Sequence, residues 1–195
     1  MHGLINRSIQ NFVTDSYGRQ SWVDVALNAR LGFIDFEGML MYKTPLTPRI
    51  VDAMCAVLMR PRGDMLEDLG TYLVSHPRLE SVRRLLRFGG VDFEDFLHSL
   101  DDLPDRARLA LPDLELPSVE LHAEGEGHFS LICEASLVGY GHVMLGVLRA
   151  MADDYGALVV LEHCGHAQGV ETITIKLVET DFAEGRQFQL GATIA

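Results

Sequence analysis

The hydrophobic periodicity of this chain changes near residue 115, and this change constrains the fold more than any other feature of the sequence. Up to residue 110, apolar residues recur at helical spacing in successive segments, which predicts a helical layer. Beyond Pro117, apolar and polar residues alternate over 119–133 on both sides of the turn-forming residues 124–127. This second pattern predicts a β-hairpin.

Helical spacing then returns for one segment before two more strands. Residues 141–155 have the spacing of a helix, which Gly156 stops because glycine tolerates positive φ. Alternation over 157–163 and 171–178 predicts the two strands. The order of elements therefore predicts an α+β fold, in which an N-terminal helical layer packs on a four-stranded, largely antiparallel sheet with one crossing helix.

The chain has 195 residues, a length typical of one domain, and no linker, repeat or low-complexity run divides it. We expect a single domain over 1–195, with a helical half in 1–110 and a sheet half in 117–179. The apolar stripes of both halves need a partner layer, so we also expect one interior shared between them.

Capping signals predict where the early helices begin and end. Gly18 is expected to end the first helix, and Ser21 to cap the second. Thr47, followed by a proline, is expected to cap the third. The fourth is expected to start at Asp64 and to end at His76, before a proline.

The charge of the chain excludes some partners. The formal net charge is −12, which repels phosphate backbones and anionic lipid, so we expect no nucleic-acid or membrane role. The one cationic cluster, which comprises Arg78, Arg83, Arg84 and Arg87, reads as a solvated helix face. We see neither a leader peptide nor a long apolar stretch in the sequence, so we expect a cytoplasmic protein.

Three cysteines at wide spacings, Cys55, Cys133 and Cys164, are expected to be reduced thiols. A compact cluster of metal-ligand types is formed by His163, Cys164 and His166, with Cys133 as a potential fourth donor to zinc. The alternative is a solvated turn, because the cluster runs into a glycine-containing segment.

The common catalytic signatures are missing from the sequence. It contains no GxSxG, P-loop, GxGxxG or HExxH motif. No nucleophile and base pair can be named either. We therefore expect a protein that is not an enzyme and that acts through a partner.

Three stretches of sequence resemble the heme-nitric-oxide/oxygen-binding (H-NOX) sensor family. They are MHGLINRSIQNFVTDSYGRQSW at 1–22, FLHSLDDLPDRARLALPDLELPSVEL at 96–121 and GYGHVMLGVLRAMADDYG at 139–156. The resemblance implies a buried heme b that binds nitric oxide or oxygen. It also implies signal transduction to a partner enzyme, such as a diguanylate cyclase or phosphodiesterase, or a histidine kinase.

The family's axial histidine falls on a proline in this chain. The family carries that histidine eight residues before the proline that matches Pro112, and this position is Pro104. Proline has no nitrogen lone pair to give to iron, and it predicts a helix restart at 101–104, capped by Asp101 or Asp102. His98 is the nearest replacement, although it shares the polar face of its helix and also reads as a solvated histidine.

The family's propionate anchor, a Tyr-x-Ser-x-Arg motif before the crossing helix, is also changed. One register gives Glu134, Ser136 and Val138, and the other gives Cys133, Ala135 and Leu137. Neither register supplies the arginine, and Ser136 is the one remnant of the motif. Two functions follow. The first is a heme-based nitric oxide sensor with altered ligation, and the second is a heme-free relative that binds another apolar ligand or acts as a protein-interaction module.

Overall fold

The computed structural model of the chain describes residues 1–134, 138–167 and 169–188. Its helices are α1 (Gly3–Tyr17), α2 (Arg19–Asn28), α3 (Leu46–Leu58), α4 (Arg62–Ser75), a 3₁₀ turn η1 (Pro77–Leu79), α5 (Glu80–Arg87), α6 (Phe93–His98), α7 (Leu103–Ala110) and α8 (Tyr140–Tyr155). Its strands are β1 (Ser118–Gly125), β2 (His128–Glu134), β3 (Leu158–Ala167) and β4 (Val170–Glu179). The succession of helices, hairpin, helix and two strands confirms the predicted α+β class.

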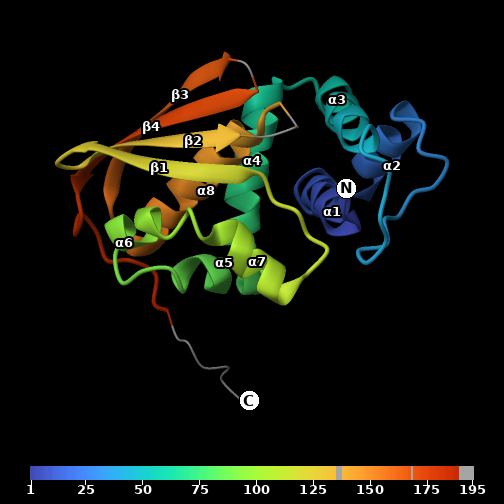
Figure 1. The fold of residues 1–195 in the computed structure, drawn as a ribbon. Coiled ribbons are helices and arrows are strands. Elements are labelled where there is room, and N and C mark those ends of the chain that lie inside the picture. Colours follow the sequence, from blue (N-terminus) through green and yellow to red (C-terminus); the bar gives the residue numbers. More distant parts are fainter. Residues whose placement is uncertain (135–137, 168, 189–195) are drawn as a thin grey trace.

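The strands form one four-stranded sheet in the order β1-β2-β4-β3, and every neighbouring pair is antiparallel. The predicted hairpin is present, with Val119 opposite Cys133. Helix α8 connects β2 to β3 and lies across one face of the sheet (Figure 1). Its buried side chains, such as Leu148 and Met151, pack with the inward residues of the strands in one apolar cluster.

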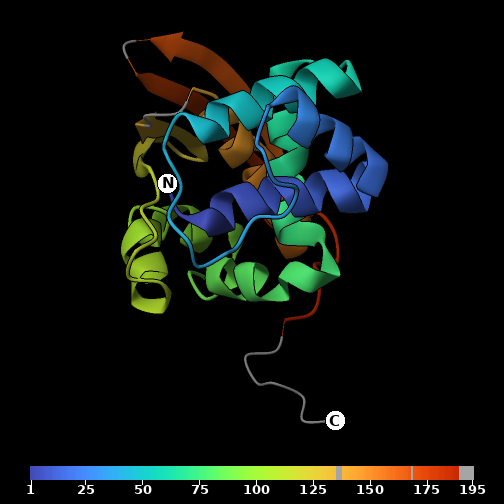
Figure 2. The same cartoon turned by 90° about the vertical axis from the view of Figure 1, so that its right-hand side faces the viewer.

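The expected interior between the helical half and the sheet half is present, but a second cluster of buried apolar residues lies apart from it. One cluster joins helices α5, α6 and α7 to α8 and the sheet. The other joins α1, α2 and α3 to one side of α4 and includes Trp22, Met54 and Met65. Figure 2 shows α1, α2 and α3 covering α4 on the side turned away from the sheet. Two lobes result, and α4 contacts both.

Helices α4 and α8 join the lobes by close packing at two glycines. A Cβ atom on Gly70 would lie 2.0 Å from the carbonyl oxygen of Val143, and one on Gly146 would lie 2.0 Å from that of Glu67. Such distances exclude any side chain, so the two helix backbones approach each other directly. Helix α4 is therefore in direct backbone contact with α8, which in turn packs on the sheet.

Some helix ends differ from the predictions. Gly18, at φ 91°, ends α1, and His76 ends α4, as expected. Ser21 lies inside α2, where its hydroxyl donates to the Tyr17 carbonyl at 2.8 Å. Thr47 lies inside α3 and donates to the side chain of Asn6 instead of capping the helix. Helix α4 begins two residues before Asp64.

The prediction that the arginine cluster forms a solvated face is wrong for Arg83. Its side chain is 3% exposed, and it donates to Asp154 at 2.7 Å and to Glu80 at 2.9 Å. Arg87, also largely covered, lies over the ring of Tyr155 at 3.8 Å. These arginines hold α5 against the end of α8.

Candidate functional site

The segment that the sequence marks as the ligand-bearing helix is broken in two. Helix α6 ends at His98, and α7 begins at Leu103 with Pro104 in its first turn. A first turn needs no hydrogen bond from the proline nitrogen, so Pro104 is accommodated without strain. This confirms the predicted restart. Asp102 occupies the cap position without a side-chain bond, whereas the Asp101 carboxylate accepts from the backbone N–H of Leu121 at 2.8 Å.

The buried face of α6 contains no nitrogen or oxygen donor from a side chain. Its inward residues are fully buried apolar groups: Phe93, Phe96, Leu97 and, just beyond the helix, Leu100. His98 lies on the opposite, exposed face, and its ring meets the ring of Phe129 edge-on at 5.8 Å. The structure therefore places His98 outside the core of the sheet lobe.

Helix α7 is fixed to its neighbours by Arg106. The guanidinium donates to the carbonyl of Ser99 at 2.8 Å and to that of Leu85 at 3.3 Å. Burial lowers the pKa of Arg106 below its ordinary value. Leu103 and Ala107 fill the inward side of α7, and Pro104 is half-buried beside them.

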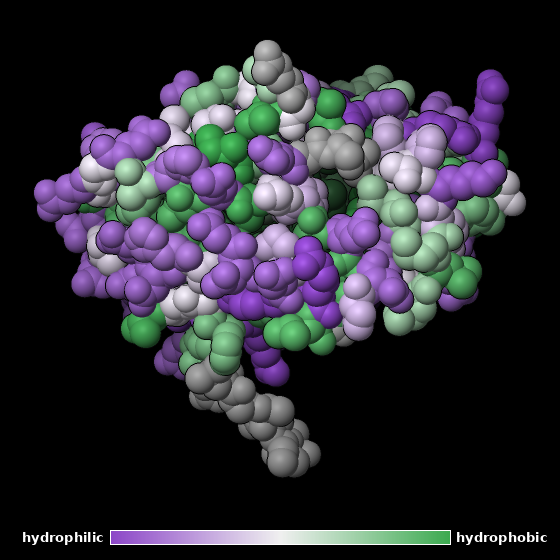
Figure 3. All heavy atoms as spheres, viewed as in Figure 1, coloured by the Kyte–Doolittle hydropathy of each residue, from purple (hydrophilic) through white to green (hydrophobic). Residues whose placement is uncertain are grey.

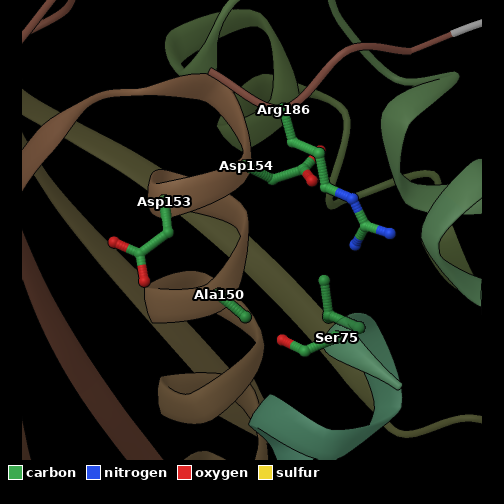
Figure 4. A pocket seen from close by; sticks show the side chains of 6 residues that line it. Ser75, Ala150, Asp153, Asp154 and Arg186 are labelled. Carbon is green, nitrogen blue, oxygen red and sulfur yellow. The ribbon is translucent and has the colours of Figure 1, made fainter. Parts of the chain in front are cut away.

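Two cavities border the described parts of α4. One, of about 380 Å³, lies between α1 and α4 and is lined by aromatic residues that include Phe12, Tyr17 and Tyr72. The other, of about 140 Å³, lies between the ends of α4 and α8, where Arg186 lies beside Asp154 (Figure 4). Neither is lined by α6 or α7. On the face drawn in Figure 3, a hollow with apolar atoms at its floor lies near the junction of the two lobes.

The segment that precedes α8 is where the resemblance places the propionate anchor. Glu134 and Val138 are exposed, and Ser136 lies outside the described residues, as do Ala135 and Leu137. Cys133 is buried, and burial together with the nearby Glu171 raises the pKa of its thiol to about 12. Burial also raises the pKa of the Tyr140 phenol.

The four residues of the zinc alternative are not brought together. Cys133 is buried on β2, whereas Cys164 and His166 are exposed on β3, which continues through the expected turn to Ala167. In the described ranges, no group of three or more His, Cys, Asp or Glu side chains is arranged to hold a metal ion. All three cysteines are free thiols, as predicted.

A polar cluster that the sequence reading missed lies at the start of α8. The Glu171 carboxylate, 3% exposed, accepts from the backbone N–H groups of Gly139 at 2.5 Å and Gly141 at 2.8 Å. It also lies 3.1 Å from Nε2 of His163, whose ring stacks on that of His142. Hydrogen bonds from the Gly139 and Gly141 N–H groups and from His163 hold the pKa of Glu171 below its ordinary value, against the opposing effect of burial. The sequence did indicate that Glu171 is buried, because it lies two residues before the inward-facing Ile173 and so shares the buried face of β4.

No helix within the described ranges is long and apolar enough to cross a bilayer.

Soluble guanylate cyclases share sequence similarity with most of this chain. The sequence is 24% identical over 163 residues to soluble guanylate cyclase gcy-31 of Caenorhabditis elegans, which is 83% of this chain and 23% of the relative. It is 22% identical to soluble guanylate cyclase 89Da of Drosophila melanogaster over 82% of this chain and 24% of that protein. The chain thus spans about a quarter of the length of these relatives.

Solved H-NOX structures share the fold. The H-NOX protein of S. oneidensis in its Fe(II)NO state superposes with a TM-score of 0.77 at 16% identity, covering 92% of this chain and 100% of that one. The unliganded Fe(II) H-NOX protein of K. algicida superposes with a TM-score of 0.77 at 18% identity, covering 94% of this chain and 100% of that one. The haem-NO-binding family matches the sequence over residues 2–163. The chain therefore belongs to the haem-NO-binding (H-NOX) family.

Proposed function

We propose that this chain is a regulatory H-NOX domain that acts through a signalling enzyme and keeps its fold without a histidine-ligated heme. The observation that carries the proposal is Pro104 in the first turn of α7, at the position that matches the family's axial histidine. The proline nitrogen is part of the peptide bond and cannot donate to iron. The usual protein ligand is therefore lost at its usual place.

His98 does not replace that ligand in this geometry. Its side chain is exposed at the end of α6, and the inward face of the helix is filled by phenylalanine and leucine. For His98 to reach the interior, the end of α6 would have to turn and bring Phe96 or Leu97 into water. Exposing one such side chain costs about 1.5–3 kcal/mol.

The propionate anchor does not fit heme either. Glu134 stands where one register needs the anchoring tyrosine, and its carboxylate repels a propionate. Val138 provides no guanidinium in that register. The residues present therefore do not fit a heme held in the manner of the family, and the proposed function includes no step through heme.

The alternative is a heme-based nitric oxide sensor whose iron is held by His98. Membership of the haem-NO-binding family is the observation that favours it. This alternative requires that heme binding reorganise the end of α6, and replacing His98 by Ala would then abolish a histidine-ligated spectrum.

The partner is inferred from the relatives. The matched proteins are soluble guanylate cyclases, and this chain corresponds to about a quarter of each. H-NOX domains are sensors, and catalysis belongs to the enzyme that they regulate. We infer that the partner is a nucleotide cyclase, a diguanylate cyclase or phosphodiesterase, or a histidine kinase, and that both proteins are cytoplasmic.

The regulatory role can be tested without heme. A signalling enzyme of each inferred class would be assayed with and without the purified, heme-free domain. We expect the domain to change the turnover of that enzyme by about tenfold, which corresponds to roughly 1.4 kcal/mol in the activation free energy. An enzyme whose turnover is unchanged at saturating domain would contradict the proposal.

A further inference from the structure

We propose that His142 and His163, together with Glu171, form a proton-sensitive joint that ties α4 and α8 to the sheet and loosens when the imidazoles are protonated. The two rings are stacked almost parallel, with their centroids 4.0 Å apart and their planes inclined by 12°. His142 lies in the first turn of α8, and His163 lies on β3. The joint therefore links the start of α8 to β3.

The hydrogen bonds of His163 fit one neutral form of its ring. Nδ1 accepts from the backbone N–H of Gly165 at 3.2 Å, so this nitrogen carries no proton. Nε2 lies 3.1 Å from the Glu171 carboxylate, to which it donates its proton. A second proton would have to go on Nδ1, where it would face the Gly165 N–H. Protonation of His163 therefore breaks this contact.

The joint is tightly packed against α4 and α8. A Cβ atom on Gly63, in the first turn of α4, would lie 2.8 Å from Cε1 of His142. A Cβ atom on Gly141 would lie 2.6 Å from the Glu171 carboxylate and 2.9 Å from Nε2 of His163. The two imidazoles and the carboxylate thus lie tightly packed between the helices and the sheet, and the His142 ring borders α4 at Gly63.

The charges that surround His142 come from each neighbouring element. Asp64 and Glu67 on α4, and Glu171 on β4, favour a proton on His142, whereas His163 on β3 opposes it. Glu67 is neutralised by Arg149 at 2.7 Å. On β2, the thiol of Cys133 lies near Glu171.

The balance of these effects favours the neutral ring. Burial is the largest effect on the pKa of His142 and lowers it, and the positive charge of a protonated His163 lowers it further. The nearby carboxylates raise this pKa by less, so it stays below its ordinary value. Two protonated rings in one stack repel each other across a partly dry space. As the pH falls, the stack is therefore expected to open.

Opening the stack affects the contact between the lobes. Glu171 holds the backbone of Gly139 and Gly141 at the start of α8, and α8 packs directly on α4 through Gly70 and Gly146. When both rings are protonated, His163 keeps its hydrogen bond to the Glu171 carboxylate, and repulsion displaces His142, which loosens the first turn of α8. The relation between α4 and the sheet then depends on pH, independently of whether heme binds.

Hydrogen exchange tests the joint. Protection factors, which are corrected for the intrinsic pH dependence of exchange, would be measured in the full chain at about pH 7.5 and about pH 5.5. We expect protection in the first turns of α4 and α8 to fall by about tenfold at the lower pH, with β1 and β2 as the internal reference. His142→Phe keeps an aromatic ring but removes one of the two charges that repel each other in the stack, so its protection should fall much less at the lower pH than that of the parent chain.

Two further variants make the result decisive. His122→Phe changes an exposed histidine on β1 and should behave like the unaltered chain. If His142→Phe does not fold, His142→Gln removes the same titration with a smaller side chain. Unchanged protection in the parent chain, or an equal pH response in the parent and in a folded His142 variant, would overturn the proposal.

Discussion

Arg83 on α5 and Asp154 on α8 form an ion pair that is almost completely buried, with Nε and Oδ1 2.7 Å apart and the side chains 3% and 4% exposed. The same guanidinium also donates to the carbonyl of Gln187 at 3.1 Å. The pair thus joins a short helix, the crossing helix and the segment that follows the sheet.

Removing one partner of this pair should be costly, because the other charge stays buried. We expect Asp154→Ala to lower the free energy of unfolding by about 3–5 kcal/mol in urea denaturation. Asp105→Ala removes the partner of Arg108 in a pair that is more than half exposed, and should cost less than about 1 kcal/mol. Equal effects of the two substitutions would contradict the account of the arginine cluster.

The contact between the lobes should not tolerate a methyl group. In Gly70→Ala, the added Cβ would lie 2.0 Å from the Val143 carbonyl oxygen, so the two helices must separate. We expect a loss of about 1–3 kcal/mol or more in the free energy of unfolding, although alanine favours helix. Asp153→Ala, at an exposed position of α8, is the control and should change stability by less than about 0.5 kcal/mol. A neutral Gly70→Ala would show that the helices are not in direct contact.

Acid stability should depend on Glu171. Its pKa is lowered in the folded chain, so its contribution is present above the ordinary pKa of a glutamate and is lost as the pH falls through the folded value. We expect the unfolding free energy of the parent chain to decrease between about pH 5 and pH 3 more steeply than that of Glu171→Gln. Glu120→Gln, an exposed position on β1, should retain the parent slope. Identical slopes for parent and Glu171→Gln would show that Glu171 is not held as a carboxylate.

Features set by local sequence were predictable. The hairpin, the crossing helix and the restart at Pro104 each follow from periodicity or from the chemistry of one residue. The burial of Phe93, Phe96 and Leu97 follows in the same way from their spacing. The two-lobe interior was not predictable, because periodicity shows that a face is buried but does not identify the layer that covers it.

Sequence patterns did not reveal the polar residues that are buried against partners far away in the sequence. Arg83 lies in a charged run that looks solvated, and the carboxylate that it pairs with is 71 residues away in sequence. Glu171 and His142 are likewise brought together by the register of the sheet and the entry of α8. Ser21 and Thr47 were misplaced because a hydroxyl in the first turns of a helix can bond to a carbonyl or to a neighbouring side chain instead of capping.

Heme titration followed by absorption spectroscopy tests the central claim most directly. Heme would be added to the purified parent chain, to Pro104→His and to His98→Ala, with an iron assay of the washed protein. We predict that the parent retains no stoichiometric heme and gives no histidine-ligated spectrum. We also predict that Pro104→His binds little more heme than the parent chain, because the propionate anchor is still missing. A parent chain that retains one heme with a histidine-ligated spectrum, which is lost in His98→Ala, would contradict the account.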